Sequence, residues 1–166
     1  MAKLIVFYSR ADENYFGGSY RYIKVGNTEK VAKQIAKQTG AELFKIVQEE
    51  PYAAEYQTCI EQAKKDLQTH ARPKLVSMPE NLDEYDEIYL GYPNYWGDLP
   101  MAVYTFLEHY NWDKKTIHPF CTHEGSCLGA TENKIRNVCE EANVTKGIAI
   151  RGSDADRAEK ALEKWI

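Results

Sequence analysis

Hydrophobic residues gather in five short runs along the chain, and segments with helical periodicity lie between them. Short apolar runs rich in β-branched and aromatic residues are typical of buried strands. The predicted strands are Lys3 to Tyr8, Glu42 to Val47, Glu87 to Tyr92, Thr116 to Cys121 and Lys146 to Ile150. Strands that alternate with helices indicate βαβ units and a mostly parallel sheet. The pattern therefore predicts an α/β fold, and a length of 166 residues suits one domain, residues 1–166, with a single core.

Two segments outside the predicted strands carry an apolar stripe at helical spacing, and we expect both to pack on the sheet. The stripes are Tyr56, Ile60, Ala63 and Leu67 in one segment, and Ala155, Ala158, Leu162 and Trp165 in the other. Further signals mark helix ends. Gly40 is placed to end the first helix and Pro100 to begin the third, while Ser153 and Asp156 resemble a capping box.

Pro119 conflicts with its predicted strand. Proline has no N–H to donate and avoids central strands, so we expect a bulge or an early strand end there.

The segment from Arg10 to Gly26 separates the first strand from the first helix. It is much longer than the usual connection of about two to six residues. We interpret it as a structureless loop that folds over something flat, because it contains several aromatic residues and two glycines. A tolerated surface insertion is the alternative.

Three unusual loops follow strands whose carboxyl ends meet if the strand order is 2-1-3-4-5. The first pairs Ser9 with Gly26-Asn27-Thr28, where a helix start either binds an anion or is simply capped. The second, Pro93 to Pro100, holds two adjacent aromatic residues that cannot both enter the core. The third, Thr122 to Gly129, has small residues that let backbone N–H groups approach the edge of a planar heterocycle. Each loop alone is also compatible with an ordinary turn.

Charge and composition narrow the function classes. The chain has 21 basic and 25 acidic residues, a net charge of -4, which argues against nucleic acid as a partner. Its four cysteines form no CxxC pair, which fits a reducing compartment, and no apolar run has the length of a membrane span or leader. We expect a cytoplasmic protein.

The string His118, Cys121, His123 and Cys127 crosses a strand and a loop and lacks the spacing of a zinc site, so we assign no metal ligands. No Ser-His-Asp or Cys-His pattern suggests hydrolysis, so we assign no catalytic residues.

With these loops the sequence resembles the flavodoxin family over nearly its whole length, in particular a branch whose first loop is lengthened. The string Tyr95-Trp96-Gly97-Asp98 is similar to the flavodoxin loop that stacks an aromatic ring on the flavin. The resemblance implies a flavodoxin-like three-layer sandwich around a five-stranded parallel sheet of order 2-1-3-4-5, with flavin mononucleotide (FMN) as cofactor.

The resemblance also implies the residues that bind FMN. Ser9, Asn27 and Thr28 would hold the phosphate. Pro93, Asn94, Tyr95, Trp96 and Gly97 would line the isoalloxazine ring, and Thr122, His123, Glu124, Gly125 and Ser126 would line its other edge. Arg10 and Tyr15 of the long first loop complete the predicted set.

Two positions depart from the family pattern. The loop after the fourth strand lacks the tyrosine that covers the second flavin face in many flavodoxins, and Cys127 stands where many relatives have glycine. Asp98 and Glu124 are the carboxylates expected near the flavin, where their charge would favour low potentials.

The implied function is that of a low-potential electron carrier whose partners are redox proteins, a reductase or a ferredoxin-type donor or acceptor. One alternative is a flavin-dependent NAD(P)H:quinone reductase, because Pro93-x-x-x-Gly97-x-x-Pro100 is similar to a string in that class. A flavin-free interaction module is the other alternative.

Overall fold

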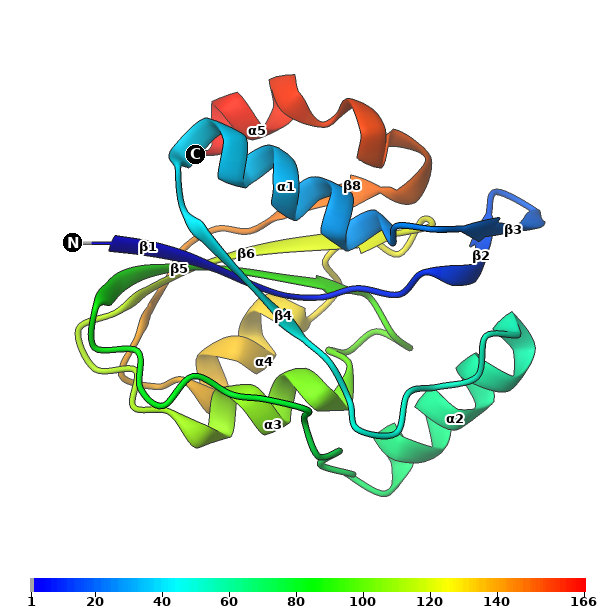
Figure 1. Ribbon diagram of the computed structural model, residues 1–166, viewed down its shortest axis with the longest axis horizontal. Helices are drawn as coiled ribbons and strands as arrows, with labels where there is room; N and C mark the ends of the chain where they lie inside the picture. The colour runs from blue at the N-terminus through cyan, green and yellow to red at the C-terminus, as the bar shows by residue number, and fades with distance from the viewer. Residues whose placement is uncertain (1) are drawn as a thin grey trace.

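The computed structural model describes residues 2–166 and contains a parallel sheet at its centre (Figure 1). Its strands are β1 (Ala2–Tyr8), β4 (Glu42–Ile46), β5 (Tyr85–Pro93), β6 (Thr116–His123), β7 (Asn143–Val144) and β8 (Ile148–Arg151). The order is β4-β1-β5-β6-β7, with β8 also paired to β6. The predicted α/β fold and the order 2-1-3-4-5 are confirmed. The fifth strand, expected as one run from Lys146 to Ile150, is instead split into β7 and β8.

Helices cover both faces of this sheet. Figure 1 shows α1 (Asn27–Thr39) and α5 (Glu159–Trp165) on one face, and α3 (Met101–His109) and α4 (Thr131–Val138) on the other. Each face has its own hydrophobic cluster, in which neighbouring residues of β1, such as Ile5 and Val6, point to opposite sides. The apolar run of β1 is continuous because both of its faces are buried.

Helix ends are partly as expected. Gly40 ends α1 in the left-handed conformation at φ 72°, and Pro100 precedes α3. The capping box predicted at Ser153 does not form. Residues Gly152–Arg157 make a 3-10 helix without a side-chain cap, and α5 begins only at Glu159.

Pro119 lies in the middle of β6, which neither bulges nor ends there, so that prediction was wrong. Its register with β5 is unbroken, from Glu87 opposite Thr116 to Pro93 opposite Thr122. The irregularity is in the strand on the other side, which breaks between β7 and β8. Gly147 in this break lies against Pro119, since a Cβ at Gly147 would be 3.0 Å from the Pro119 carbonyl oxygen. The missing N–H therefore falls where the neighbouring strand is interrupted.

The segment after β1 is a β-hairpin and not the structureless loop that we expected. Strands β2 (Asp12–Phe16) and β3 (Ser19–Ile23) pair in antiparallel fashion around Gly17 and Gly18. Both glycines have positive φ, 53° and 108°, as a two-residue hairpin turn requires.

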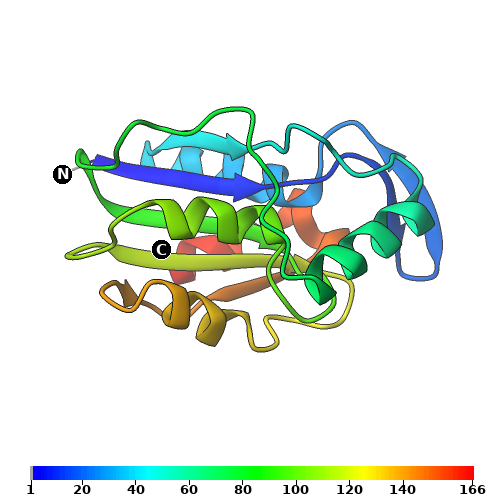
Figure 2. The ribbon, with the colours of Figure 1, turned by 90° about the horizontal axis from the view of Figure 1, so that it is seen from below.

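Helix α2 (Tyr56–Gln68) lies beyond the carboxyl ends of the strands, beside the hairpin (Figure 2). We expected its apolar stripe to pack on the sheet, but its buried residues Cys59 and Ala63 face a pocket at the strand ends. The Glu13 carboxylate accepts a hydrogen bond from the Tyr56 N–H at 2.9 Å, which joins the hairpin to the start of α2. Of the helices within residues 2–166, none has the length and apolar character needed to cross a bilayer.

Candidate functional site

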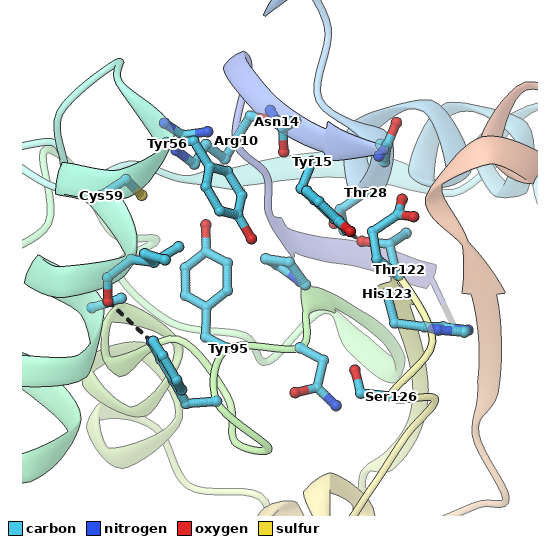
Figure 3. Close-up of a pocket in the computed structure, with 17 residues that line it drawn as sticks. Arg10, Asn14, Tyr15, Thr28, Tyr56, Cys59, Tyr95, Thr122, His123 and Ser126 are labelled. Atoms are coloured by element: carbon cyan, nitrogen blue, oxygen red, sulfur yellow. Dashed lines mark hydrogen bonds between the residues drawn. The ribbon is translucent and has the colours of Figure 1, made fainter. Parts of the chain in front are cut away.

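A pocket of about 360 Å³ opens at the carboxyl ends of β1, β5 and β6 (Figure 3). Open α/β sheets bind ligands at this edge, where the strand order reverses between β1 and β5. Most of the residues predicted to bind FMN line the pocket: Arg10, Tyr15, Asn27, Thr28, Pro93, Asn94, Tyr95, Trp96, Thr122, His123, Glu124 and Ser126. Ser9, Gly97 and Gly125 lie next to these residues in the chain but not on the wall.

The start of α1 forms one end of the pocket. Its N-cap is Gly26, which offers no side chain, and the Ser9 hydroxyl accepts a hydrogen bond from the Glu29 N–H at 3.0 Å instead. A Cβ at Gly26 would lie 2.2 Å from the Ser9 oxygen, so only glycine permits this approach. Because Ser9 accepts this bond, its own hydrogen remains available to an anion. Backbone N–H groups of the first turn lack helical partners, and the helix dipole favours negative charge there.

Buried polar atoms flank this helix start. The Thr28 and Thr122 hydroxyls lie 2.7 Å apart, joining α1 to the end of β6. Among the described residues, Asn27 Oδ1 and Glu124 Oε1 are buried without a hydrogen-bond partner. Such atoms are uncommon in folded proteins.

Glu124 points toward the hairpin and the start of α1. Burial raises the pKa of its carboxyl, although the Gly17 N–H, which donates to Oε2 at 3.3 Å, and the nearby Arg151 act in the opposite direction. Gly152 makes room for this side chain, since a Cβ there would lie 2.2 Å from Glu124 Oε1. A carboxyl held in this way ionises less readily than an exposed one.

The loop after β5 is a tight turn. Tyr95 and Asp98 exchange two backbone hydrogen bonds, of 2.9 and 3.0 Å. The two residues between them, Trp96 and Gly97, have positive φ values of 57° and 78°. Glycine adopts this conformation at little cost, but tryptophan rarely does, and such strain is often found at functional sites.

Asn94 connects this turn to the loop after β6. Its side-chain oxygen accepts the Gly97 N–H, and its amide nitrogen donates to the Cys127 carbonyl, both at 2.9 Å. Cys127 has a φ of 55°, a conformation that glycine adopts freely and other residues adopt only with strain. Glycine at this position would therefore remove the strain. In the same loop His123 Nδ1 accepts the Gly125 N–H, and burial, with the charge of Arg151, lowers the pKa of His123. The two loops thus hold each other in place.

Neighbouring helices hold two further side chains of the β5 loop. The Trp96 side chain is half exposed and packs on α2, where its indole N–H donates to the Ile60 carbonyl at 3.0 Å. Asp98 is outside the pocket. Its carboxylate is buried and contacts the Tyr104 hydroxyl at 2.6 Å and the Lys134 ammonium at 3.1 Å, so it is a structural residue and does not place free charge near the pocket.

The hairpin forms the outer wall. The Tyr15 ring packs against those of Tyr20 and Tyr56, with centroids 6.0 and 6.1 Å away. The Arg10 guanidinium donates to the carbonyls of Ala53 and Ala54 at 2.9 and 2.8 Å, which ties the hairpin to the segment before α2.

The sequence did not indicate the residues that α2 contributes to the pocket. Tyr56, Cys59, Ile60 and Ala63 line it, together with Asn14 of the hairpin. Most of them share the helical stripe that we assigned to the sheet, and amphipathicity alone does not identify what an apolar face covers. Within residues 2–166, no group of three or more His, Cys, Asp or Glu side chains is arranged to hold a metal ion.

Comparison with known proteins defines the family of the chain. A family model described as flavodoxin matches residues 18–166, and the chain therefore belongs to the flavodoxin family. No curated protein is significantly similar in sequence.

Solved structures share the fold. A candidate flavoprotein from Bacteroides eggerthii is 23% identical with a TM-score of 0.79, over 99% of this chain and 94% of its own. A flavoprotein from Lactobacillus acidophilus, solved in complex with FMN, is 22% identical with a TM-score of 0.70, over 99% of this chain and 97% of its own. Flavodoxin 2 from Bacillus cereus is 15% identical with a TM-score of 0.51, over 99% of this chain and all 100% of its own.

Proposed function

We propose that this flavodoxin-family protein binds FMN in the pocket and acts as a low-potential electron carrier. One observation carries the FMN assignment. A helix start suited to an anion opens into a pocket with aromatic and polar walls, at the point where the strand order reverses. The Lactobacillus acidophilus flavoprotein, which shares this fold, was solved with FMN.

The residues present fit such a ligand. Ser9, Asn27 and the first N–H groups of α1 would hold the phosphate. Asn94 and the loop from Thr122 to Ser126 would contact the polar edge of the isoalloxazine, and the Tyr95 ring would lie against its flat face. When bound, FMN supplies the electron-accepting chemistry, and the protein binds it, orients it and sets its surroundings.

Binding of the phosphate is the first test. The protein should bind FMN at least about tenfold more tightly than riboflavin, because riboflavin has no phosphate for the start of α1. Ser9→Ala should reduce the FMN affinity about tenfold and leave that of riboflavin unchanged. Thr39→Ala, which removes a hydroxyl at the other end of the same helix, is the matched control. Calorimetric titration measures all of these affinities, and equal affinities for FMN and riboflavin would contradict the proposal.

A second measurement separates the carrier from an enzyme. A carrier loaded with FMN should be reduced slowly by NADH or NADPH alone and rapidly once a flavodoxin reductase is added. Rapid reduction by NAD(P)H alone, followed by rapid reoxidation with a quinone, would favour the quinone reductase. The apolar surface that α2 adds to the pocket makes this second candidate worth testing.

A further inference from the structure

The Glu124 carboxyl lies at the start of α1, although its backbone belongs to the loop after β6. A Cβ at Gly152 would be 2.2 Å from Glu124 Oε1 and 2.6 Å from the amide nitrogen of Asn27, the first residue of α1. The two side chains therefore converge on Gly152. The Gly17 N–H, at the tip of the hairpin, donates to the other carboxyl oxygen at 3.3 Å. Figure 3 shows Thr28 of α1 on the same side of the pocket as His123, which leads into this loop.

Two oxygens at this point lack a hydrogen-bond donor. Within residues 2–166, Glu124 Oε1 and Asn27 Oδ1 are buried and have no partner. An ionised carboxylate only accepts hydrogen bonds, whereas a protonated carboxyl also has an O–H to donate. A proton on Oε1 therefore adds the kind of group that both oxygens lack.

Charged groups from three elements face Glu124. Burial raises the pKa of its carboxyl, while the hairpin N–H, Arg151 of β8 and Arg21 of β3 lower it, and Asp154 of the 3-10 helix raises it. The side chains of Arg151, Arg21 and Asp154 are exposed, so water and salt screen their charges. The adjacent His123 has a pKa lowered by burial and by Arg151, so it is mainly neutral near pH 7.

A phosphate at the start of α1 adds the one large negative charge that this carboxyl does not yet face. A phosphate monoester carries about −1.5 to −2 charges near pH 7, and a like charge nearby disfavours ionisation of a carboxyl. We propose that FMN binding is coupled to proton uptake by Glu124, whose carboxyl lies beside the phosphate and takes a proton from solvent as FMN binds. This inference rests on the proposed function and gives the FMN site a pH dependence.

The experiment compares the natural chain with Glu124→Gln, whose amide does not titrate. From about pH 5.5 to about pH 8, the FMN affinity of the natural chain should fall about tenfold relative to that of Glu124→Gln, the effect of a shift of about one pKa unit on binding. The two proteins should bind FMN equally at the acid end, and Glu124→Gln more tightly at the alkaline end. Their ratio of riboflavin affinities should not change with pH, because riboflavin has no phosphate.

Calorimetric titration measures these affinities, and the comparison cancels the titration of the FMN phosphate and of His123, which all the proteins share. Repeating it in buffers of different ionisation enthalpy counts the protons, and the natural chain should take up more per FMN than Glu124→Gln. The matched control is Asp154→Asn, which removes the same charge from an exposed carboxyl near Glu124 and should keep the pH dependence within about twofold.

A second variant keeps the charge and moves it. Gly152→Ala places a Cβ against the ends of the Glu124 and Asn27 side chains, which are able to swing away, and should reduce the pH dependence to about threefold or less. It decides the question if Glu124→Gln does not fold. Parallel pH profiles of the natural chain and Glu124→Gln, or weaker FMN binding by Glu124→Gln at every pH, would overturn the coupling and leave the proposed function intact. No binding of FMN to the natural chain would overturn both.

Discussion

The side-chain oxygens of Thr28 and Thr122 lie 2.7 Å apart and join the first turn of α1 to the last residues of β6. Both side chains are almost fully buried, with 1% and 4% of their surface exposed. Neither hydroxyl is therefore able to turn to water if the other is removed.

This pair predicts a specific pattern of stability. Thr28→Val or Thr122→Val alone should lower the free energy of unfolding by about 1 to 2 kcal/mol, because the remaining hydroxyl is buried without its partner. The double variant should cost clearly less than the sum of the two. Urea denaturation measures all three. Thr58→Val, at an exposed position of α2, should change stability by no more than about 0.5 kcal/mol. Additive losses would mean that the two hydroxyls do not interact.

The hairpin is expected to slow FMN release, because Tyr15 lines the pocket and packs on Tyr56 of α2. Tyr15→Ala should speed release about three- to tenfold, as expected from losing aromatic contacts of about 0.5 to 1.5 kcal/mol each. Stopped-flow fluorescence after dilution measures the rate. Tyr22→Ala is the control, since this tyrosine lies on the same hairpin but is 69% exposed. An unchanged rate in Tyr15→Ala would show that the hairpin does not cover the ligand.

Tyr95 is expected to quench the fluorescence of bound FMN more than Trp96 does. The Tyr95 ring stands in the pocket, whereas the Trp96 indole is hydrogen-bonded to the Ile60 carbonyl on α2. Tyr95→Leu should therefore raise the emission of bound FMN about severalfold, and Trp96→Leu should raise it less. The reverse order would mean that Trp96 leaves α2 and stacks on the flavin.

Glu124 predicts a pH dependence of stability. Burial raises the pKa of its carboxyl in the folded protein, so the folded state holds its proton more tightly than the unfolded state. Ionised Glu124 is thus unfavourable, and its contribution to stability falls as pH rises from the unfolded pKa through the raised folded one. Glu124→Gln should gain stability relative to the natural chain as pH rises above about 4, the unfolded value for a glutamate.

Glu29 provides a control of opposite sign for this experiment. Burial acts to raise its pKa, but hydrogen bonds from Lys45 and Lys33 outweigh this effect and lower it. Its stabilising contribution is present above the unfolded pKa and is lost as pH falls. Glu29→Gln should therefore be less stable than the natural chain by a constant amount above about pH 4, and this deficit should shrink as pH falls below about 4. Thermal unfolding measured on both sides of about pH 4 distinguishes the two variants, and parallel curves would contradict both pKa directions.

Much of the fold was predictable because the strands obey simple physical rules. Strands buried on both faces must be apolar throughout, and each helix between them carries one apolar stripe. The alternation of strands and helices could therefore be predicted from the sequence. The hairpin could also have been predicted, since Gly17-Gly18 between two aromatic runs is a hairpin signal. The unusual length of the connection and its aromatic residues led instead to the prediction of a structureless loop.

The candidate site was less predictable. Its loops were identifiable because Asn94 and Gly97 follow a strand directly, and parallel strands bring such loops to one edge. The wall that α2 contributes to the pocket was not identifiable, because an apolar stripe such as Ile60 and Ala63 has the same spacing whether it covers a sheet or a pocket. Nor does sequence reveal that Asp98 is paired with Lys134, which lies on a helix much later in the chain.

The interruption between β7 and β8 also affects how this protein meets other molecules. A strand at the margin of a sheet exposes a row of backbone donors and acceptors, which a strand from another chain is able to extend. Here that margin consists of a two-residue and a four-residue strand, and Pro119 behind the gap has no N–H to offer. An incoming strand would find no continuous ladder. This side of the molecule is thereby protected against edge-to-edge aggregation.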